Sequence, residues 1–435
     1  MASIDTAGAI AGQSAIAELL SDVIGTERTQ FALSTLVFEP SLHEAADLVS
    51  RAQLAIALNA ALFVDLLDRV PTAARYVAQC RAAGEGIVFD HGALRTVAGE
   101  TGALPSGHDA FGRFLEPMGY EVGGLYPLPR LTMTGRAYVH KDMPAAIPQF
   151  FVSELHVDQL PQSAQDAATR IFSGSQDPLG DAEWRALDAL AANGAVPLDE
   201  AVVILRGALR AFDRQHPAPA LADYEALLEH SKEGAWIATE GNAFNHATTR
   251  VPDVVSLADS LKAQGYPLKE AVEHSANGRV HQTALIADKV ERPFVLADGS
   301  TQMREVPGSF YEFITRDVDP EEGTLDQGAP GVSGMARDWC RAARRACTGI
   351  QGRAGNAQGS HGRNHLARDR QALVGDPQRD RLDDRQGRYL DQGAGRARGR
   401  AAVGHAVRPG GAAAQSAWRD GGAWPVQLSR PLAQR

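Results

Sequence analysis

The sequence predicts an α+β fold in which one strand–helix–strand unit occurs twice, with a helical N-terminus before it and a helical insert between the copies. The first copy runs strand, helix, strand, strand over residues 86–97, 108–120, 131–142 and 148–158. The second copy repeats this order with one further strand, over residues 243–251, 251–266, 278–290, 292–299 and 308–317. Alternating apolar residues indicate the strands, and 3.6-residue periodicity indicates the helices.

Two further regularities support a duplication. Each of the two helices ends at a Gly-Tyr pair. Each first strand carries a histidine and each last strand a glutamate, with 63 residues from His91 to Glu154 and 66 from His246 to Glu312. An internal repeat is the simplest explanation, although any one of these matches could arise by chance.

Helical patterns fill the remainder of the first 325 residues. SAIAELLSDVIG places Ile16, Leu19 and Leu20 on one face, and a long apolar segment follows at 41–70 with Ser41 as its expected N-cap. A helical insert is expected at about 181–231, where two amphipathic segments are joined by HPAPA. We interpret both helical regions as packing against the predicted sheet.

The bulk composition is that of a globular protein, with 44% hydrophobic residues and a net charge of −10. The N-terminus lacks the basic start of a secretory signal, and no apolar run reaches the roughly 18 residues that cross a membrane. The three cysteines show no disulfide-framework spacing. These features predict a cytoplasmic protein without a membrane partner, and they leave its oligomeric state open.

The C-terminal part differs sharply from the rest. Residues 331–435 contain 19 Arg and 8 Asp but no Lys, Glu or Phe, a net charge of +11, whereas residues 1–330 carry −21. A nucleic-acid-binding tail would normally mix Lys with Arg and offer aromatic platforms. Arg, Gly, Ala and Pro in this mixture are what a GC-rich gene encodes when read out of frame. We therefore predict a core of residues 1–325 and a frameshifted tail of residues 326–435, with a disordered basic tail or a folded domain as alternatives.

His91, His246 and Glu312 form a candidate metal site. Two neutral imidazoles and one carboxylate, with other positions open, are typical of non-haem Fe(II) oxygenases. In GSFYEFITRD, strand alternation puts Glu312 on the same face as Phe310 and Ile314. A carboxylate there would be costly unless it were paired or bound to a metal. Each residue alone also has a structural explanation, and four further histidines compete for the role: His140, His156, His274 and His281.

Arg95 follows His91 by four residues, close enough to bring its guanidinium into the same cavity. A guanidinium suits bidentate capture of a carboxylate, so an anionic substrate is expected. The alternative is an arginine exposed on the surface.

Four segments carry a resemblance to a known family: FDHGALRTV, HKDMPAAIPQFFVSEL, GNAFNHATTRV and GSFYEFITRD. Together they resemble the 2-oxoadipate dioxygenase/decarboxylase family over about residues 15–320. That family looks like a branch of the vicinal-oxygen-chelate superfamily, whose paired βαβββ modules match the repeat. The resemblance implies that His91, His246 and Glu312 bind Fe(II), and that His91, Arg95 and His246 contact the substrate. The implied reaction converts 2-oxoadipate and O₂ to 2-hydroxyglutarate and CO₂, a step in lysine catabolism.

The resemblance ends where the tail begins. Family members continue after the FITRD strand into folded sequence that closes the pocket, and from about residue 324 the Arg/Gly-rich tail replaces it here. Two other functions stay open on the sequence. One is a non-redox isomerase or lyase that uses Zn²⁺ or Ni²⁺ as a Lewis acid, with Glu154 as fourth ligand or general base. The other is a catalytically inactive homologue.

Overall fold

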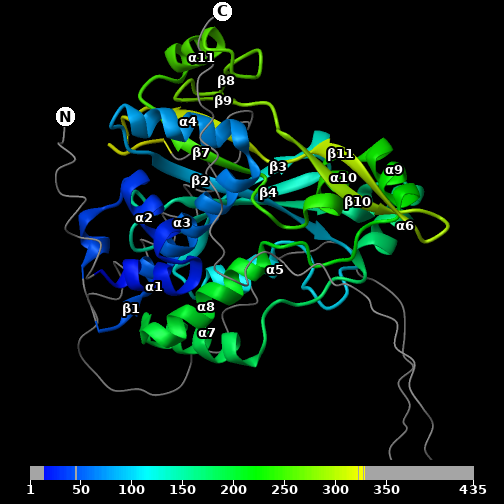
Figure 1. Cartoon of the computed structure of the whole chain (residues 1–435), viewed down its shortest axis with the longest axis horizontal. Coiled ribbons are helices and arrows are strands. Elements are labelled where there is room, and N and C mark those ends of the chain that lie inside the picture. The colour runs from blue at the N-terminus through cyan, green and yellow to red at the C-terminus, as the bar shows by residue number, and fades with distance from the viewer. Residues whose placement is uncertain (1–13, 45–46, 322, 327, 329–435) are drawn as a thin grey trace, which may run out of the picture. The chain divides into compact units, whose positions relative to one another are not determined.

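A computed structural model describes residues 14–44, 47–321, 323–326 and 328. At its centre is one eight-stranded sheet (Figure 1). Its strands are β2 (Val88–Ala98), β3 (Tyr120–Leu128), β4 (Met133–His140), β5 (Gln149–His156), β7 (His246–Arg250), β8 (Glu273–His274), β9 (Val280–Ala284) and β12 (Phe310–Arg316). They lie in the order β3-β4-β5-β2-β7-β12-β9-β8, so two four-stranded halves meet at the antiparallel pair of β2 and β7.

Both halves have the same topology. In the first half, β2 pairs in parallel with β5, and β4 and β3 follow in antiparallel order. In the second half, β7 pairs in parallel with β12, and β9 and β8 follow in the same way. Helices α5 (Asp109–Leu115) and α11 (Val254–Ala263) occupy equivalent places after the first strand of each half. The predicted α+β fold with duplicated βαβββ modules is therefore confirmed.

Strand register relates the two halves by a pseudo-twofold axis. On the central pair of strands, His91 lies opposite Thr248 and Ala93 lies opposite His246. Because β2 and β7 are antiparallel, this register maps His91 onto His246. A bulge between Phe89 and His91 shifts the pairing beyond this point, so that Arg250 lies opposite Val88.

One strand of the second half differs from the prediction. Residues 292–299 were expected as a strand of the repeated unit. Instead β10 (Lys289–Val295) pairs with β11 (Thr301–Pro307) in a separate two-stranded sheet. The physical reason is where its apolar residue is buried: the ring of Phe294 packs against Tyr224 of the helical insert, with centroids 4.7 Å apart. The apolar alternation expected for this segment is present, but its buried side chain packs against a helix outside the main sheet.

Four N-terminal helices lie on the side of the sheet opposite the candidate site, where the last two contact β7 and β12 and the first two pack on the third. They are α1 (Ala15–Ile24), α2 (Thr26–Thr35), α3 (Arg51–Arg69) and α4 (Pro71–Ala82). Phe63 of α3 contacts Phe89 of β2 and Tyr311 of β12. A capping box between Ser50 and Gln53 starts α3. The expected N-cap, Ser41, is therefore wrong, and it lies in the 3₁₀ turn Pro40–His43.

The helical insert is longer than the predicted 181–231. It comprises α6 (Gln162–Phe172), α7 (Asp181–Asn193), α8 (Leu198–Ala211), α9 (Leu221–His230) and α10 (Lys232–Glu240). Helix α8 packs against α1 and α3 (Figure 1), and a short ladder of β1 (Val49–Ser50) with β6 (Ala195–Val196) joins the same region. Helices α6, α9 and α10 contact one another, and α10 also contacts β2. The insert therefore reaches the strand that carries His91 and Arg95.

No helix within residues 14–328 that the structure describes is both long and apolar enough to cross a membrane. Apart from Asp326 and Gly328, the predicted tail of residues 326–435 lies outside the described residues. Its interpretation as a frameshifted segment, and the boundary at residue 325, stay predictions.

Candidate metal centre

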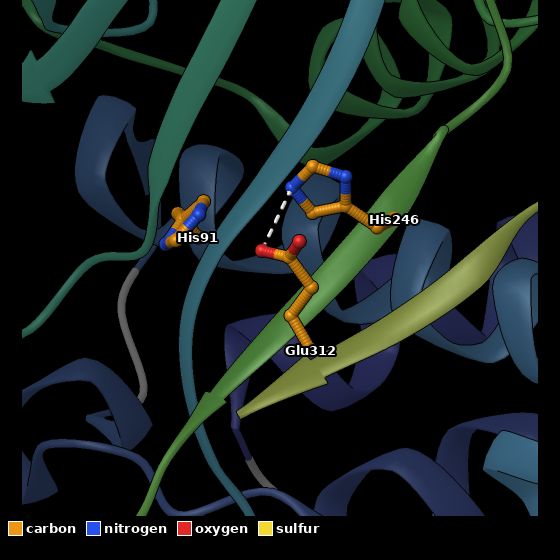
Figure 2. Close-up of side chains that lie close together, drawn as sticks. All are labelled: His91, His246 and Glu312. Atoms are coloured by element: carbon orange, nitrogen blue, oxygen red, sulfur yellow. Dashed lines mark ion pairs between the residues drawn. The ribbon is translucent and has the colours of Figure 1, made fainter. Parts of the chain in front are cut away.

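Three adjacent strands bring His91, His246 and Glu312 together. The strands β2, β7 and β12 are neighbours in the sheet, and both His91 and Glu312 lie opposite Thr248 of the middle strand. One donor atom from each of the three side chains lies within 4.8 Å of the others. Figure 2 shows the imidazole of His246 directed at the carboxylate of Glu312, with Nε2 and Oε2 3.3 Å apart. The structure thus groups the three residues that the sequence singled out.

Burial determines the electrostatics of this group. Glu312 is 4% exposed, and burial raises the pKa of its carboxyl. Burial and the neighbouring His91 lower the pKa of His246 well below its ordinary value. Neutral imidazoles and a carboxylate are the donors that a divalent transition metal takes. A bound cation would also offset the cost of burying the carboxylate charge, so the donor set fits such a metal.

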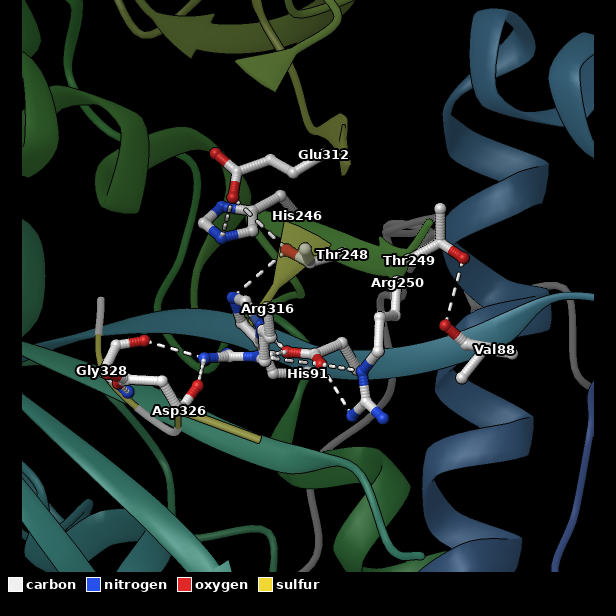
Figure 3. Close-up of polar contacts among 11 residues, drawn as sticks. Val88, His91, His246, Thr248, Thr249, Arg250, Glu312, Arg316, Asp326 and Gly328 are labelled. Carbon is white, nitrogen blue, oxygen red and sulfur yellow. Dashed lines mark hydrogen bonds and ion pairs between the residues drawn. The ribbon is translucent and has the colours of Figure 1, made fainter. Parts of the chain in front are cut away.

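Asp90 fixes the ring of His91. Its Oδ1 lies 2.8 Å from Nδ1 of His91, which leaves Nε2 facing Thr248 at 3.1 Å and the centre of the site. Arg250 and Arg316 bind the same carboxylate at 2.9 and 2.7 Å (Figure 3). Although burial opposes ionisation, the charge of Arg316 holds the pKa of Asp90 well below its ordinary value. A carboxylate on the second nitrogen of a ligand histidine fixes its tautomer and orientation.

A cavity of about 290 Å³ opens over the three donors. This volume is at the lower end of the roughly 300–1,000 Å³ found for small-molecule sites, so a small ligand fits. Apolar residues of β3, β4, β5 and the turn between β3 and β4 form much of its wall, among them Tyr126, Leu128, Leu131, Met133, Ala137 and Phe151.

Arg95 lines this cavity, as its position after His91 predicted. Its guanidinium lies 5.1 Å from the centre of the Trp236 ring of α10. Burial lowers the pKa of Arg95 to about 10, which leaves the side chain charged at neutral pH. Across the described part of the chain, no carboxylate lies within ion-pair distance of Arg95. The charge of Glu233 acts on Arg95 from beyond ion-pair distance, so an anionic ligand in the cavity can become the direct partner of the guanidinium.

The competing histidines lie elsewhere. His140 is fully buried, where its Nε2 donates to the carbonyl of Met118 and its Nδ1 accepts from the backbone N–H groups of Asp142 and Met143. His156 contacts a threonine hydroxyl at 2.8 Å. His274 and His281 face each other across β8 and β9. None of the four lines the cavity that contains the metal site.

Glu154 lies outside the site. Alternation along β5 directs it away from the cavity, where its carboxylate accepts a hydrogen bond from the backbone N–H of His108 at 2.8 Å. Its other oxygen pairs with Arg136 at 3.2 Å. These partners satisfy the buried carboxylate without a metal. A role for Glu154 as fourth ligand or general base therefore loses its structural support.

Strand register explains why the similar His-to-Glu spacings do not make Glu154 equivalent to Glu312. On the last strand of each half, the residue opposite the histidine is Gln149 or Phe310. Glu312 comes two positions after Phe310, and two positions after Gln149 comes Phe151. The counterpart of Glu312 is therefore an apolar residue, and Glu154 lies three positions further along its strand.

Sequence reasoning missed Asp90, Thr248 and Arg316. Each lies within four residues of a candidate ligand, in DHG, HATTR and EFITR. Adjacency alone does not distinguish such residues from ordinary strand residues. Their contribution became visible once the pairing of β2, β7 and β12 was known. Arg316 then binds the carboxylate of Asp90, and the hydroxyl of Thr248 contacts His91 and Glu312.

Comparisons with known proteins relate the chain to one enzyme family. The sequence profile of the 2-oxoadipate dioxygenase/decarboxylase family matches residues 59–322, which include the three grouped donors. A chloroplastic/amyloplastic 2-oxoadipate dioxygenase/decarboxylase of Oryza sativa subsp. japonica is 25% identical over 270 residues, 59% of this chain and 67% of its own. A chloroplastic protein of the same name from Arabidopsis thaliana is 26% identical over 185 residues, 40% of this chain and 43% of its own.

Among solved structures, a glyoxalase superfamily protein from Ralstonia eutropha JMP134 is 47% identical with a TM-score of 0.70. The match covers 73% of this chain and 98% of that one. It supports the duplicated fold described above. Because the family profile spans more than half of the sequence and contains the whole candidate site, the chain belongs to the 2-oxoadipate dioxygenase/decarboxylase family.

Proposed function

We propose that this protein converts 2-oxoadipate and O₂ to 2-hydroxyglutarate and CO₂, in the cytoplasm and as part of lysine catabolism. Family membership supports the reaction class. The structural observation that carries the proposal is the shared cavity, in which a three-donor group and an unpaired guanidinium face the same small space. A 2-oxo dicarboxylic acid has matching chemistry at its two ends.

The proposed metal is Fe(II), held by His91, His246 and Glu312. When bound, it supplies the redox chemistry with dioxygen that a Lewis-acidic ion such as Zn²⁺ lacks. Three protein donors leave positions free for a substrate and for O₂. The contacts of Asp90 and Thr248 keep His91 and Glu312 in place before any ligand binds.

The chain's own residues orient the substrate. We assign the distal carboxylate to Arg95, and the 2-oxo acid end to the neighbourhood of His91 and His246. Apolar side chains such as Leu128 and Phe151 would cover the methylene chain and exclude water. Holding both ends of the molecule selects which carbon meets the oxidant, since misplacement by about 1 Å can cost a hundredfold in rate.

The test compares 2-oxoadipate with 2-oxohexanoate, which has the same chain length but a methyl group in place of the distal carboxylate. Initial O₂ uptake is measured with iron-loaded wild type, Arg95→Ala and Arg95→Lys. Arg95→Ala should lose about 3 kcal/mol, roughly a hundredfold in kcat/KM, on 2-oxoadipate alone. Arg95→Lys should recover part of this, because an ammonium cannot pair in bidentate fashion.

Two controls accompany these variants. Arg81→Ala removes an arginine that lies 4.5 Å from the ring of Phe31, outside the cavity, and should leave both substrates unaffected. His246→Ala should lose bound iron, whereas the Arg95 variants should keep it. Absence of 2-oxoadipate-dependent O₂ uptake in iron-loaded wild type would contradict the proposed reaction. Equal losses on both substrates would mean that Arg95 supports the fold instead of binding the distal carboxylate.

A further inference from the structure

The two halves of the sheet carry the same pair of residues at the same spacing. Arg95 follows His91 by four positions on β2, and Arg250 follows His246 by four positions on β7. Arg95 and Arg250 therefore correspond by their spacing from the two histidines, while a bulge between Phe89 and His91 shifts the pairing at Arg250, which lies opposite Val88. Each half carries one such arginine, and Arg95 is the one that lines the cavity.

The residue before each histidine breaks this equivalence. Asp90 precedes His91, whereas Asn245 precedes His246. Both residues are 4% exposed, and each contacts Nδ1 of the following histidine, at 2.8 Å for Asp90 and 3.0 Å for Asn245. The two residues thus have the same place before their histidines, but the carboxylate of Asp90 accepts from Nδ1 whereas the amide nitrogen of Asn245 donates to it. They differ in charge, since one is a carboxylate and the other an amide.

The charge decides what happens to each arginine. Asp90 pairs with Arg250 at 2.9 Å from Nε and 2.8 Å from Nη2, so that arginine is neutralised within the protein. The equivalent combination in the other half is Asn245 with Arg95. Both line the cavity, and an amide offers no counter-charge. The guanidinium that faces the cavity is therefore in the half whose equivalent of Asp90 is uncharged.

We infer that Asn245 determines the specificity for a substrate with an anionic tail. Its amide is neutral, whereas Asp90, at the equivalent place in the other half, is a carboxylate that pairs with an arginine. The distal carboxylate of the substrate then supplies to Arg95 the charge that Asp90 supplies to Arg250. The inference rests on the proposed function for the identity of that substrate. It assigns Asn245 a role in selecting charge that is separate from its contact with His246.

Asn245→Asp is the central test, because it changes charge with almost no change in shape. A carboxylate at this position can contact Nδ1 of His246 as an acceptor, as Asp90 does for His91, in the imidazole tautomer that carries its proton on Nδ1. Binding of 2-oxoadipate and of 2-oxohexanoate is measured by calorimetry on Fe(II)-loaded protein without oxygen, so no turnover occurs. The variant should lose on the order of tenfold to a hundredfold in affinity for 2-oxoadipate. Its affinity for 2-oxohexanoate should change by less than about threefold.

Asn245→Ala is the matched control, because it removes the amide without adding charge. It should keep the preference for 2-oxoadipate over 2-oxohexanoate. If Ala and Asp at this position lost that preference equally, the amide itself would bind the tail and the inference would be overturned. If Asn245→Asp failed to fold, Asn245→Ala would still test the inference. A retained preference for 2-oxoadipate would support it, and a lost preference would mean that the amide itself binds the tail.

A second measurement separates this inference from the proposed reaction. Glutarate, a dicarboxylate without a keto group, is added to the metal-free protein and the Tm is recorded. It should raise the Tm of wild type and of Asn245→Ala, but not of Asn245→Asp or Arg95→Ala. That pattern without any O₂ uptake would mean that the proposed reaction fails while the charge selection by Asn245 stands. Equal Tm shifts in all four proteins would overturn the inference whatever the reaction.

Discussion

Asp90→Asn tests the ion cluster that joins the three ligand-bearing strands. Asp90 belongs to β2, Arg250 to β7 and Arg316 to β12, and these strands also carry His91, His246 and Glu312. The side chains of Asp90 and Arg316 are 2% and 3% exposed. The substitution keeps the shape of the side chain and removes its charge, so two guanidinium groups lose their shared counter-ion.

The expected loss follows from burial. Removing one partner of a buried ion pair typically costs about 3–5 kcal/mol, because the other charge stays buried without compensation. Arg316 also donates to the backbone carbonyls of Asp326 and Gly328, each at 2.8 Å. Those contacts survive the substitution, so we expect a loss near the lower limit, about 3 kcal/mol. A typical domain is stable by about 5–15 kcal/mol, so this change is large enough to measure.

The assay is urea unfolding of the metal-free protein in a chelator, which removes any contribution from metal binding. Asp142→Asn is the control: Asp142 pairs with Arg51 at 2.6 Å, but the side chains are 40% and 27% exposed. That pair should contribute less than about 1 kcal/mol. Equal losses in the two variants would refute the reasoning from burial.

The same variant has a predicted pH dependence. The pKa of Asp90 in the folded protein lies well below its ordinary value of 3.8. A depressed carboxyl pKa contributes stability that is fully present above the unfolded pKa and is lost as the pH falls through the folded pKa. The difference between wild type and Asp90→Asn should therefore stay constant from pH 7 to about 5 and shrink below about 4. A difference that grows under acid conditions would contradict this sign.

Three further outcomes are expected. Thr248→Val removes the hydroxyl that donates to Glu312 at 3.2 Å, so titration with Fe(II) should show a loss of about tenfold in affinity, and an unchanged affinity would exclude this orienting role. Glu154→Gln should keep full metal content but lower the free energy of unfolding by about 1–3 kcal/mol, whereas metal loss would return Glu154 to the site. Burial lowers the pKa of His140 and of His216 to about 4, so the unfolded state binds more protons between pH 4 and 6.5. Unfolding experiments should then show stability falling by about 1.4 kcal/mol per pH unit for each histidine as the pH drops through this range, and a flat profile would contradict it.

The sequence by itself determined the fold class and the identity of the grouped residues. Apolar alternation and helical periodicity are local properties, so the repeated order of strands and helices could be read before any strand pairing was known. His91, His246 and Glu312 could be named because each is a metal-ligand type on a predicted strand, and because the segments around them resemble a known family. Arg95 could be placed near them because four positions along a strand keep a side chain on the same face.

Strand pairing was decided only in the tertiary structure. Whether Glu154 or Phe151 corresponds to Glu312 depends on a register that differs by three positions, and no local pattern reports register. The hairpin of β10 and β11 alternates like a sheet strand, yet it packs on the helical insert. Its place depends on burial against residues that are distant in the sequence, and local periodicity does not report such contacts.

The difference between Asp90 and Asn245 shows this division most clearly. Both letters are visible in the sequence, each directly before a histidine. What each does depends on which arginine lies beside it across the β2–β7 pair, a contact between residues more than a hundred positions apart. Short-range patterns encode which groups are present. Long-range pairing decides which charges meet and which are left for a ligand.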